Sequence, residues 1–315
     1  MTAETTRRQW LAATGAAAGT LAVGAAPSAL RAAEPKSAPA VKFCLNTSTI
    51  RGQKLSITEE VDLAGKAGYQ GLEPWIGELQ QYVKDGGSLP DLKKRIADAG
   101  LQVESAIGFA EWIVDDADRR AKGLEQAKRD MELVKQIGGS RIAAPPAGAT
   151  KQADLNLAEA GKRYRALLEV GKEIGVVPQL EVWGFSACLS RLSETLYVAS
   201  EAGHSDACVL PDVYHLYKGG TAFDSLKLLA GSAVHVFHMN DYPAEPPRTE
   251  INDAARVHCG DGIAPLTDIL RGLFARGFRG VLSLELFNPN YYKQDAAVVL
   301  KEGLEKMQKA VAAAV

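Results

Sequence analysis

The sequence is poor in cysteine and histidine, with four and five residues respectively in a chain of 315. No C-x-x-C pair occurs among the cysteines, which argues against a zinc ribbon or a thioredoxin-type redox site and leaves one disulfide open. No G-x-G-x-x-G or Walker sequence follows any strand-like segment. A glycine-rich phosphate loop is therefore not expected.

An excess of basic charge is also missing, because the formal net charge is -2. Such a chain offers no basic face to nucleic acid and no polybasic segment to an anionic membrane surface. The remaining composition, 46% hydrophobic and 23% charged residues, is typical of a soluble globular protein. A small neutral or polar molecule is the partner that these values favour, and they leave open whether the protein is a monomer or a homo-oligomer.

The first 33 residues differ in character from the rest of the chain. The pair Arg7-Arg8 precedes a weakly apolar run from Ala12 to Ala26, and a segment of small residues ends at Ala33. This order resembles a twin-arginine export signal and predicts a periplasmic protein. The apolar run is too short and too rich in alanine and glycine for a stable membrane span. The alternative is a disordered tail with a chance arginine pair.

Residues 34–40 form a predicted linker, and residues 41–315 form a predicted single domain of alternating strands and helices. Strict alternation predicts a parallel α/β sheet, and eight repeats favour closure into a (β/α)8 TIM barrel over an open doubly wound sheet. A loop is expected over residues 241–264, which are rich in Pro, Asp and Gly. The predicted strands are 41–46, 71–75, 103–107, 141–145, 177–183, 207–212, 234–240 and 280–287. The predicted helices are 57–67, 89–99, 116–137, 157–174, 192–202, 224–229, 266–276 and 295–313.

One carboxylate, Glu285, lies inside the apolar run of the last predicted strand. An unpaired buried carboxylate is very costly, so a compensating cation is expected. Ser283, Glu285 and Phe287 share one face of the strand because side chains alternate, and the leucines between them share the other. The leucine face suits the helical layer, which places Glu285 in the barrel lumen.

Four consecutive predicted strands end in a residue that can ligate a metal: Glu181, Asp212, His238 and Glu285. The C-terminal ends of barrel strands meet at one face, where TIM barrel active sites lie. Three carboxylates and one imidazole suit one divalent cation, Mn, Zn, Mg or Co, with positions left open for substrate and water. The alternative for each residue alone is a helix cap or a loop anchor.

This ligand set and strand order resemble the xylose isomerase-like TIM barrels, the sugar isomerase/epimerase superfamily that also contains endonuclease IV. Endonuclease IV itself is disfavoured, because its site needs more histidines and no basic DNA face exists. Within the superfamily the similarity to the inosose (2-keto-myo-inositol) isomerases covers residues 41 to 315. It is carried by Phe43-Cys44-Leu45-Asn46, Gly68-Tyr69-Gln70-Gly71-Leu72-Glu73, Phe237-His238-Met239-Asn240-Asp241, Arg256-Val257, Gly260-Asp261-Gly262, Leu284-Glu285-Leu286-Phe287 and Tyr291-Tyr292-Lys293.

The resemblance implies that the four strand-end residues bind one metal ion, and that Glu181 and Glu285 also flank a sugar or cyclitol substrate as an acid/base pair. A metal on a carbonyl and its neighbouring hydroxyl stabilises an enediolate, while a carboxylate removes the α-proton. Returning the proton to the neighbouring carbon isomerises the substrate. Returning it to the other face of the same carbon epimerises it.

Four further residues are candidates for substrate contacts. By the resemblance, His215 contacts a substrate oxygen and Arg256 fixes a hydroxyl or carboxylate; an ordinary loop histidine and a surface salt bridge are the competing interpretations. Trp75 and Trp183, with Phe287, could form apolar walls for a sugar ring or could be packing residues.

Two departures bear on the function. Cytosolic inositol-catabolic relatives lack an export signal. Ketose 3-epimerases place a second glutamate shortly after the first metal ligand, and no such glutamate follows Glu181 in this sequence. The prediction is an isomerase or epimerase of a keto-sugar or keto-inositol. The alternatives are a lyase or dehydratase acting on 3-keto-glycosides or inosose, and a periplasmic sugar-binding barrel without catalysis.

Overall fold

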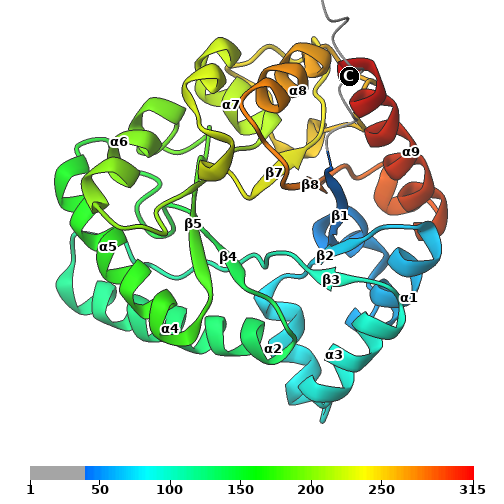
Figure 1. The fold of residues 1–315 in the computed structure, drawn as a ribbon, viewed down its shortest axis with the longest axis horizontal. Coiled ribbons are helices and arrows are strands. Elements are labelled where there is room, and N and C mark those ends of the chain that lie inside the picture. The colour runs from blue at the N-terminus through cyan, green and yellow to red at the C-terminus, as the bar shows by residue number, and fades with distance from the viewer. Residues whose placement is uncertain (1–39) are drawn as a thin grey trace, which may run out of the picture. The chain divides into compact units, whose positions relative to one another are not determined.

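Eight parallel strands lie at the centre of the protein, whose structure is a computed structural model that describes residues 40–315. Helices surround the strands on the outside (Figure 1). The strands are β1 Lys42–Asn46, β2 Gly71–Glu73, β3 Gln102–Val103, β4 Arg141–Ala144, β5 Val177–Glu181, β6 Val209–Leu210, β7 Val236–Met239 and β8 Val281–Leu284.

The strands form two sheets that join edge to edge. One has the order β3-β2-β1-β8-β7 and the other β4-β5-β6. Parallel bridges from Val209 to Val234 and from Asp212 to His238 connect β6 to β7. At the other seam the Ala143 amide donates to the Ala106 carbonyl at 2.8 Å, next to β3 and β4. The predicted TIM barrel is therefore confirmed for residues 40–315.

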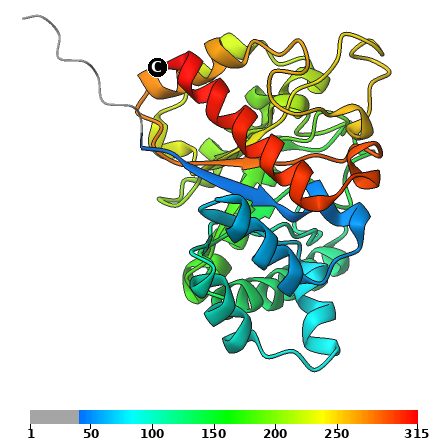
Figure 2. The ribbon, with the colours of Figure 1, turned by 90° about the vertical axis from the view of Figure 1, so that its right-hand side faces the viewer.

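The helices begin and end at the residues that the sequence favours. Ser56 and Glu59 form a capping box at the start of α1, and Gly68 ends that helix with φ of 95°, a backbone conformation that glycine adopts without strain. α1 and α9 lie side by side on the outside of the barrel (Figure 2). The helices are α1 Ile57–Ala67, α2 Ile76–Lys84, α3 Leu89–Asp98, α4 Ala117–Gln136, α5 Leu157–Ile174, α6 Leu192–Ala202, α7 Val213–Gly219, α8 Leu266–Ala275 and α9 Ala296–Ala314.

The predicted inside and outside faces of the last strand are confirmed by two separate apolar clusters. Leu282, Leu284 and Leu286 belong to the large cluster that the helices cover. Val281 and Val236 belong to a separate small cluster of lumen residues, and Ser283 and His238, two residues further along each strand, share their face. The polar side chains of β7 and β8 therefore face the barrel interior.

Three details of the predicted elements are wrong. The predicted helix 224–229 is a 3-10 helix that spans Phe223–Leu228, and the short helices α2 and α7 were not predicted. Several strands are shorter than expected, so Glu285 follows β8 directly. His215 consequently lies in α7 and not in a loop. A helix of seven residues spans only about two turns, which is too short for a clear apolar period.

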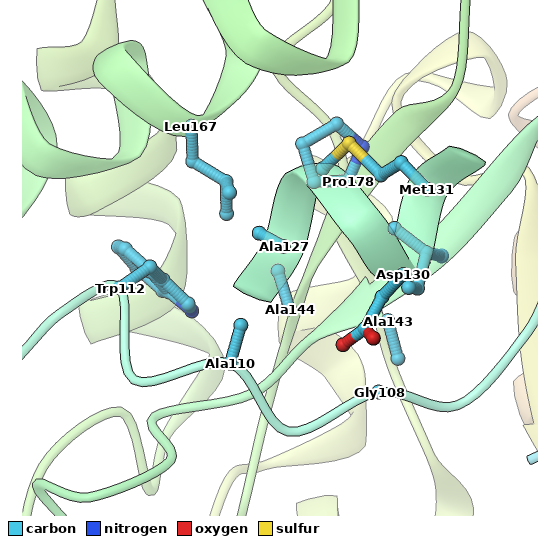
Figure 3. A pocket seen from close by; sticks show the side chains of 11 residues that line it. Gly108, Ala110, Trp112, Ala127, Asp130, Met131, Ala143, Ala144, Leu167 and Pro178 are labelled. Carbon is cyan, nitrogen blue, oxygen red and sulfur yellow. The ribbon is translucent and has the colours of Figure 1, made fainter. Parts of the chain in front are cut away.

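A small gap of about 10 Å³ lies between α4 and β4, far too small for a substrate (Figure 3). Asp130 of α4 points into it and accepts a hydrogen bond from the Gln80 amide at 3.3 Å. Burial raises the pKa of Asp130. This carboxylate belongs to the interface between helix and barrel and takes no part in the site described below.

The predicted export signal, residues 1–33, and all of the predicted linker except Ala40 lie outside the described residues. Within residues 40–315 no helix combines the length and apolarity that crossing a bilayer requires. All four cysteines are buried free thiols, so the disulfide that the sequence left open is absent from this structure.

Candidate active site

The other three strand-end residues converge on the imidazole of His238 in β7. Its Nδ1 atom lies 3.4 Å from Glu285 Oε2, 3.8 Å from Asp212 Oδ2 and 3.9 Å from Glu181 Oε1. Ligand atoms of Asp212, His238 and Glu285 all lie within 4.8 Å of one another. Glu181, the last residue of β5, stands beside this group of three.

Asp212 acts in two directions at once. Its Oδ1 atom caps α7 by accepting from the His215 amide at 2.7 Å, while its Oδ2 atom faces His238. Asn240 donates to the same Oδ2 at 2.9 Å. The helix cap that competed with the metal-ligand interpretation is therefore present, but it occupies only one of the two carboxylate oxygens.

Glu73, at the end of β2, orients His238 from the opposite side. Its Oε2 atom lies 3.0 Å from His238 Nε2 and also accepts from Ser283 Oγ at 2.7 Å and from Asn46 Nδ2 at 3.0 Å. Hydrogen bonding to a carboxylate assigns the ring proton to Nε2. This leaves Nδ1, which is buried and has no hydrogen-bond partner, directed at the three carboxylates. Against the effect of burial, Glu285 and Glu73 raise the pKa of His238, so the ring carries a second proton on Nδ1, and this atom offers a lone pair once a metal ion takes the place of that proton.

Arg256 is the fixed cation of the site. Its Nη1 donates to Asp212 Oδ2 at 2.9 Å and to Glu285 Oε2 at 2.7 Å, and its Nη2 pairs with Asp253 at 2.6 Å. The side chain is completely buried, which contradicts the surface salt bridge considered from the sequence. Its donors are directed at the carboxylates, so Arg256 holds Glu285 in place.

The two glutamates have opposite pKa shifts. Burial raises the pKa of Glu181 to about 8, and neighbouring carboxylates add to this effect against the opposing influence of His238. Burial alone would raise the pKa of Glu285, but His238 and Arg256 lower it well below its usual range. Carboxyl pairs whose pKa values are pushed apart are typical of acid/base catalysis.

The donor set fits a divalent cation. Glu73, Glu181, Asp212 and Glu285 are each at most 3% exposed, and Arg256 is the buried guanidinium among them. One guanidinium leaves a surplus of buried negative charge, which is costly without a further cation. The unpartnered atoms Glu181 Oε2 and His238 Nδ1 are the kind of ligands that Mn, Zn, Mg or Co accept.

A cavity of about 410 Å³ opens above these residues, and Glu181, Glu285, His215 and Arg256 all line it. His215 Nε2 accepts from Arg256 Nη2 at 3.0 Å, so its proton is assigned to Nδ1, which has no partner. Burial and Arg256 lower the pKa of His215, which keeps the ring neutral. This imidazole therefore presents a free N–H donor.

Five Trp and Phe rings line one side of the cavity, and the predicted Trp75 and Trp183 are both among them. Phe109 connects the two, with ring centroids 5.1 Å from Trp75 and 6.0 Å from Trp183. Phe287 meets the other edge of Trp75 at 6.1 Å. Such an apolar wall above a polar floor is the usual form of a small-molecule site.

Comparison with known proteins gives the family. Residues 61–310 match the model of the xylose isomerase-like TIM barrel. The chain belongs to this family. Inosose isomerase of Bacillus velezensis is 26% identical over 278 residues, covering 86% of this chain and 97% of the relative. 3-Dehydroshikimate dehydratase of Pseudomonas putida is 24% identical and covers 80% of this chain, but only 39% of that longer protein is matched.

Among solved structures, the IOLI protein with a bound zinc atom has a TM-score of 0.81 at 23% identity, covering 87% of this chain and 99% of that one. At this identity the likeness shows the fold. In this family member the ligand roles of Glu181, Asp212, His238 and Glu285 remain predictions, which the geometry described above supports.

Sequence reasoning gave little weight to the residues that support the site. Asn46 donates to both Glu73 and Glu285, the latter at 3.1 Å, and Trp75 Nε1 donates to its Oδ1 at 3.0 Å. Glu73 was visible in the sequence only as the last residue of the motif Gly68-Tyr69-Gln70-Gly71-Leu72-Glu73. Both residues end a strand, as the four predicted ligands do, and that position was the signal available in the sequence.

Proposed function

We propose that this protein is a divalent-metal-dependent isomerase or epimerase of a keto-sugar or keto-inositol. The observation that carries this proposal is the position of Glu181 and Glu285, which face one cavity beside the unpartnered Nδ1 of His238. The inosose isomerase relatives support the reaction class.

Asp212, His238, Glu285 and Glu181 would hold the metal ion. When bound, a divalent cation polarises the carbonyl and neighbouring hydroxyl of a substrate and so acidifies the α-proton. Glu285 would remove that proton, because Arg256 and Asn46 keep its carboxylate ionised and fixed at the cavity floor.

The remaining cavity residues position the substrate. Glu181 would return the proton, to the neighbouring carbon in isomerisation or to the opposite face in epimerisation. His215 Nδ1–H would donate to a substrate oxygen, since this buried donor has no protein partner. Trp75 and Trp183 would cover the C–H faces of the sugar ring and exclude water.

The proposal is tested by α-proton exchange in heavy water over keto-inositols, ketoses and 3-keto-glycosides, together with metal analysis of the native protein. Glu285→Gln should abolish exchange and turnover while circular dichroism stays unchanged. The matched control, Glu305→Gln on the exposed face of α9, should behave as wild type. Near-normal turnover by Glu285→Gln would refute the assigned role.

A second candidate is a lyase or dehydratase that uses the same α-proton abstraction and then eliminates a β-substituent. The 3-dehydroshikimate dehydratase relatives favour keeping it. The mass of the product separates the two reactions, because elimination of water or an aglycone changes the mass and isomerisation does not. A protein that stays metal-free and exchanges no proton would instead be a sugar-binding barrel.

We also propose that the protein is exported to the periplasm by the twin-arginine route, on the grounds of Arg7-Arg8 and the apolar run that follows. This route carries folded proteins, so the metal would be acquired before export. N-terminal sequencing of the mature protein tests the proposal, and a mature chain that begins at Met1 contradicts it.

A further inference from the structure

A second arginine, Arg51, lies at the rim of the same cavity and plays no part in the proposed chemistry. It belongs to the 3-10 helix Thr47–Gln53, which follows β1 directly. Its guanidinium carbon lies 4.7 Å from the ring centroid of Trp75 and 5.0 Å from that of Phe287. Two aromatic rings thus fix the position of one cation.

Arg51 differs from Arg256 in its ion pairs. Arg256 pairs with Asp212, Asp253 and Glu285, so its charge is matched within the protein. Across residues 40–315, by contrast, no carboxylate oxygen lies within 4.0 Å of the Arg51 guanidinium. Rings that contact the face of a guanidinium leave its N–H groups free in the plane. Tyr292 lies against the guanidinium as a hydrogen-bonding neighbour, but it carries no charge, so the charge of Arg51 stays unmatched and is available to whatever enters the cavity.

The surroundings suit a single negative charge. Asp253 lines the same cavity. Glu78 is also near: burial raises the pKa of Glu78, and the positive charge of Arg51 is one of the influences that oppose this rise. Acidic groups repel a phosphate dianion more strongly than a singly charged carboxylate, and a dianion usually requires several cations or backbone amides, whereas Arg51 is a single guanidinium. A carboxylate carries one charge and matches the two parallel N–H groups of one guanidinium.

We propose that Arg51 selects substrates that carry a carboxylate, so that the physiological substrate is an anionic polyhydroxy ketone, a keto-acid of the sugar or cyclitol class. The proposal rests on the proposed function, because it assigns the substrate of the same cavity. Arg51 would bind the end of the substrate remote from the carbonyl, while Glu181 and Glu285 face the reacting carbons.

The test compares ketoses with ketouronates that differ only in a terminal carboxylate: D-fructose with D-fructuronate, and D-tagatose with D-tagaturonate. Binding to the metal-loaded protein is read from the fluorescence of Trp75 and Trp183, which line the cavity. Turnover is read separately from α-proton exchange. D-Fructose 6-phosphate serves as the dianionic probe.

In the wild-type protein the ketouronate should bind more tightly than its ketose. Arg51→Gln should lower the ratio of kcat/KM, ketouronate over ketose, by about 10- to 100-fold, as expected for the loss of a charge-assisted hydrogen bond. Arg51→Lys should restore part of the ratio. The control Arg271→Gln, which removes an exposed partner of Asp268 on α8, should leave it unchanged.

Four results would overturn the proposal: no binding of either ketouronate, no preference over the ketose, an equal loss for both compounds in Arg51→Gln, or tighter binding of the phosphate probe. Failure of the proposed function looks different. Ketouronates that bind through Arg51 without exchanging a proton refute the isomerase and leave the Arg51 assignment intact.

Discussion

Glu73→Gln is the substitution that most directly tests how the barrel prepares His238 for a metal. Glu73 Oε2 accepts from Asn46, Ser283 and His238, and its side chain is completely buried outside the cavity. The substitution preserves shape and removes the charge that fixes the ring. Partners of this kind change metal affinity by about 10- to 100-fold. We expect Kd for Zn or Mn to rise by that factor.

The loss of metal affinity in Glu73→Gln can also be expressed as a loss of folding free energy. At a metal concentration of about 100 Kd, binding stabilises the folded protein by about 2.7 kcal/mol. A Kd raised 10- to 100-fold reduces this stabilisation to about 0.4–1.4 kcal/mol. The metal-free variant should itself lose about 1–3 kcal/mol, because Glu73 Oε1 has no partner and an amide nitrogen in its place would be an unsatisfied donor.

Isothermal titration calorimetry of the metal and denaturant unfolding with and without it measure both quantities. Ser283→Ala is the matched control, since it removes one donor to the same oxygen but keeps the charge of Glu73. It should cost about 1 kcal/mol of stability and leave metal affinity nearly unchanged. Wild-type affinity in Glu73→Gln, or an equal loss in Ser283→Ala, would show that Glu73 does not act through His238.

Three further predictions test the electrostatics and packing of the barrel. Burial raises the pKa of Glu60 to about 9, so stability present at low pH should fall by up to about 1.4 kcal/mol per pH unit between pH 4.5 and 9. In Glu60→Gln the free energy of unfolding, measured with urea, should depend less on pH, and the same dependence as in the wild type contradicts this. Burial, with Lys306, lowers the pKa of His258 to about 4, so stability present above pH 6.5 should fall by about 3 kcal/mol towards pH 4. His258→Phe should remove that fall, and a variant that still loses stability in acid contradicts the assignment to His258. Gly184→Ala would place a methyl group against a backbone carbonyl of α7 and should lower the free energy of unfolding by about 1–3 kcal/mol. Gly272→Ala, in open space on α8, should raise it by about 0.5–1 kcal/mol. Equal effects of the two substitutions would refute the packing argument.

The barrel and the location of the site were predictable from the sequence because both depend on local patterns. Alternation of strands and helices indicates a parallel barrel, and the period of two along β8 indicates which face Glu285 occupies. The short helix α7 was missed because seven residues carry too little periodicity. Asp212, which caps the start of α7, is a local signal for a helix, but an aspartate at this position also agrees with a metal ligand at the end of a strand.

The sequence by itself determined the (β/α)8 class, the lumen face of the strands and the strand ends at which the polar residues gather. Only the tertiary structure decided which oxygen of Asp212 caps a helix and which faces His238. It also decided that Glu73 fixes the imidazole, and that Arg256 forms ion pairs with carboxylates while Arg51 forms none among the described residues. The physical reason is that these contacts join residues far apart in the chain. Their partners are set by the register and closure of the barrel, which side-chain order along one strand does not encode.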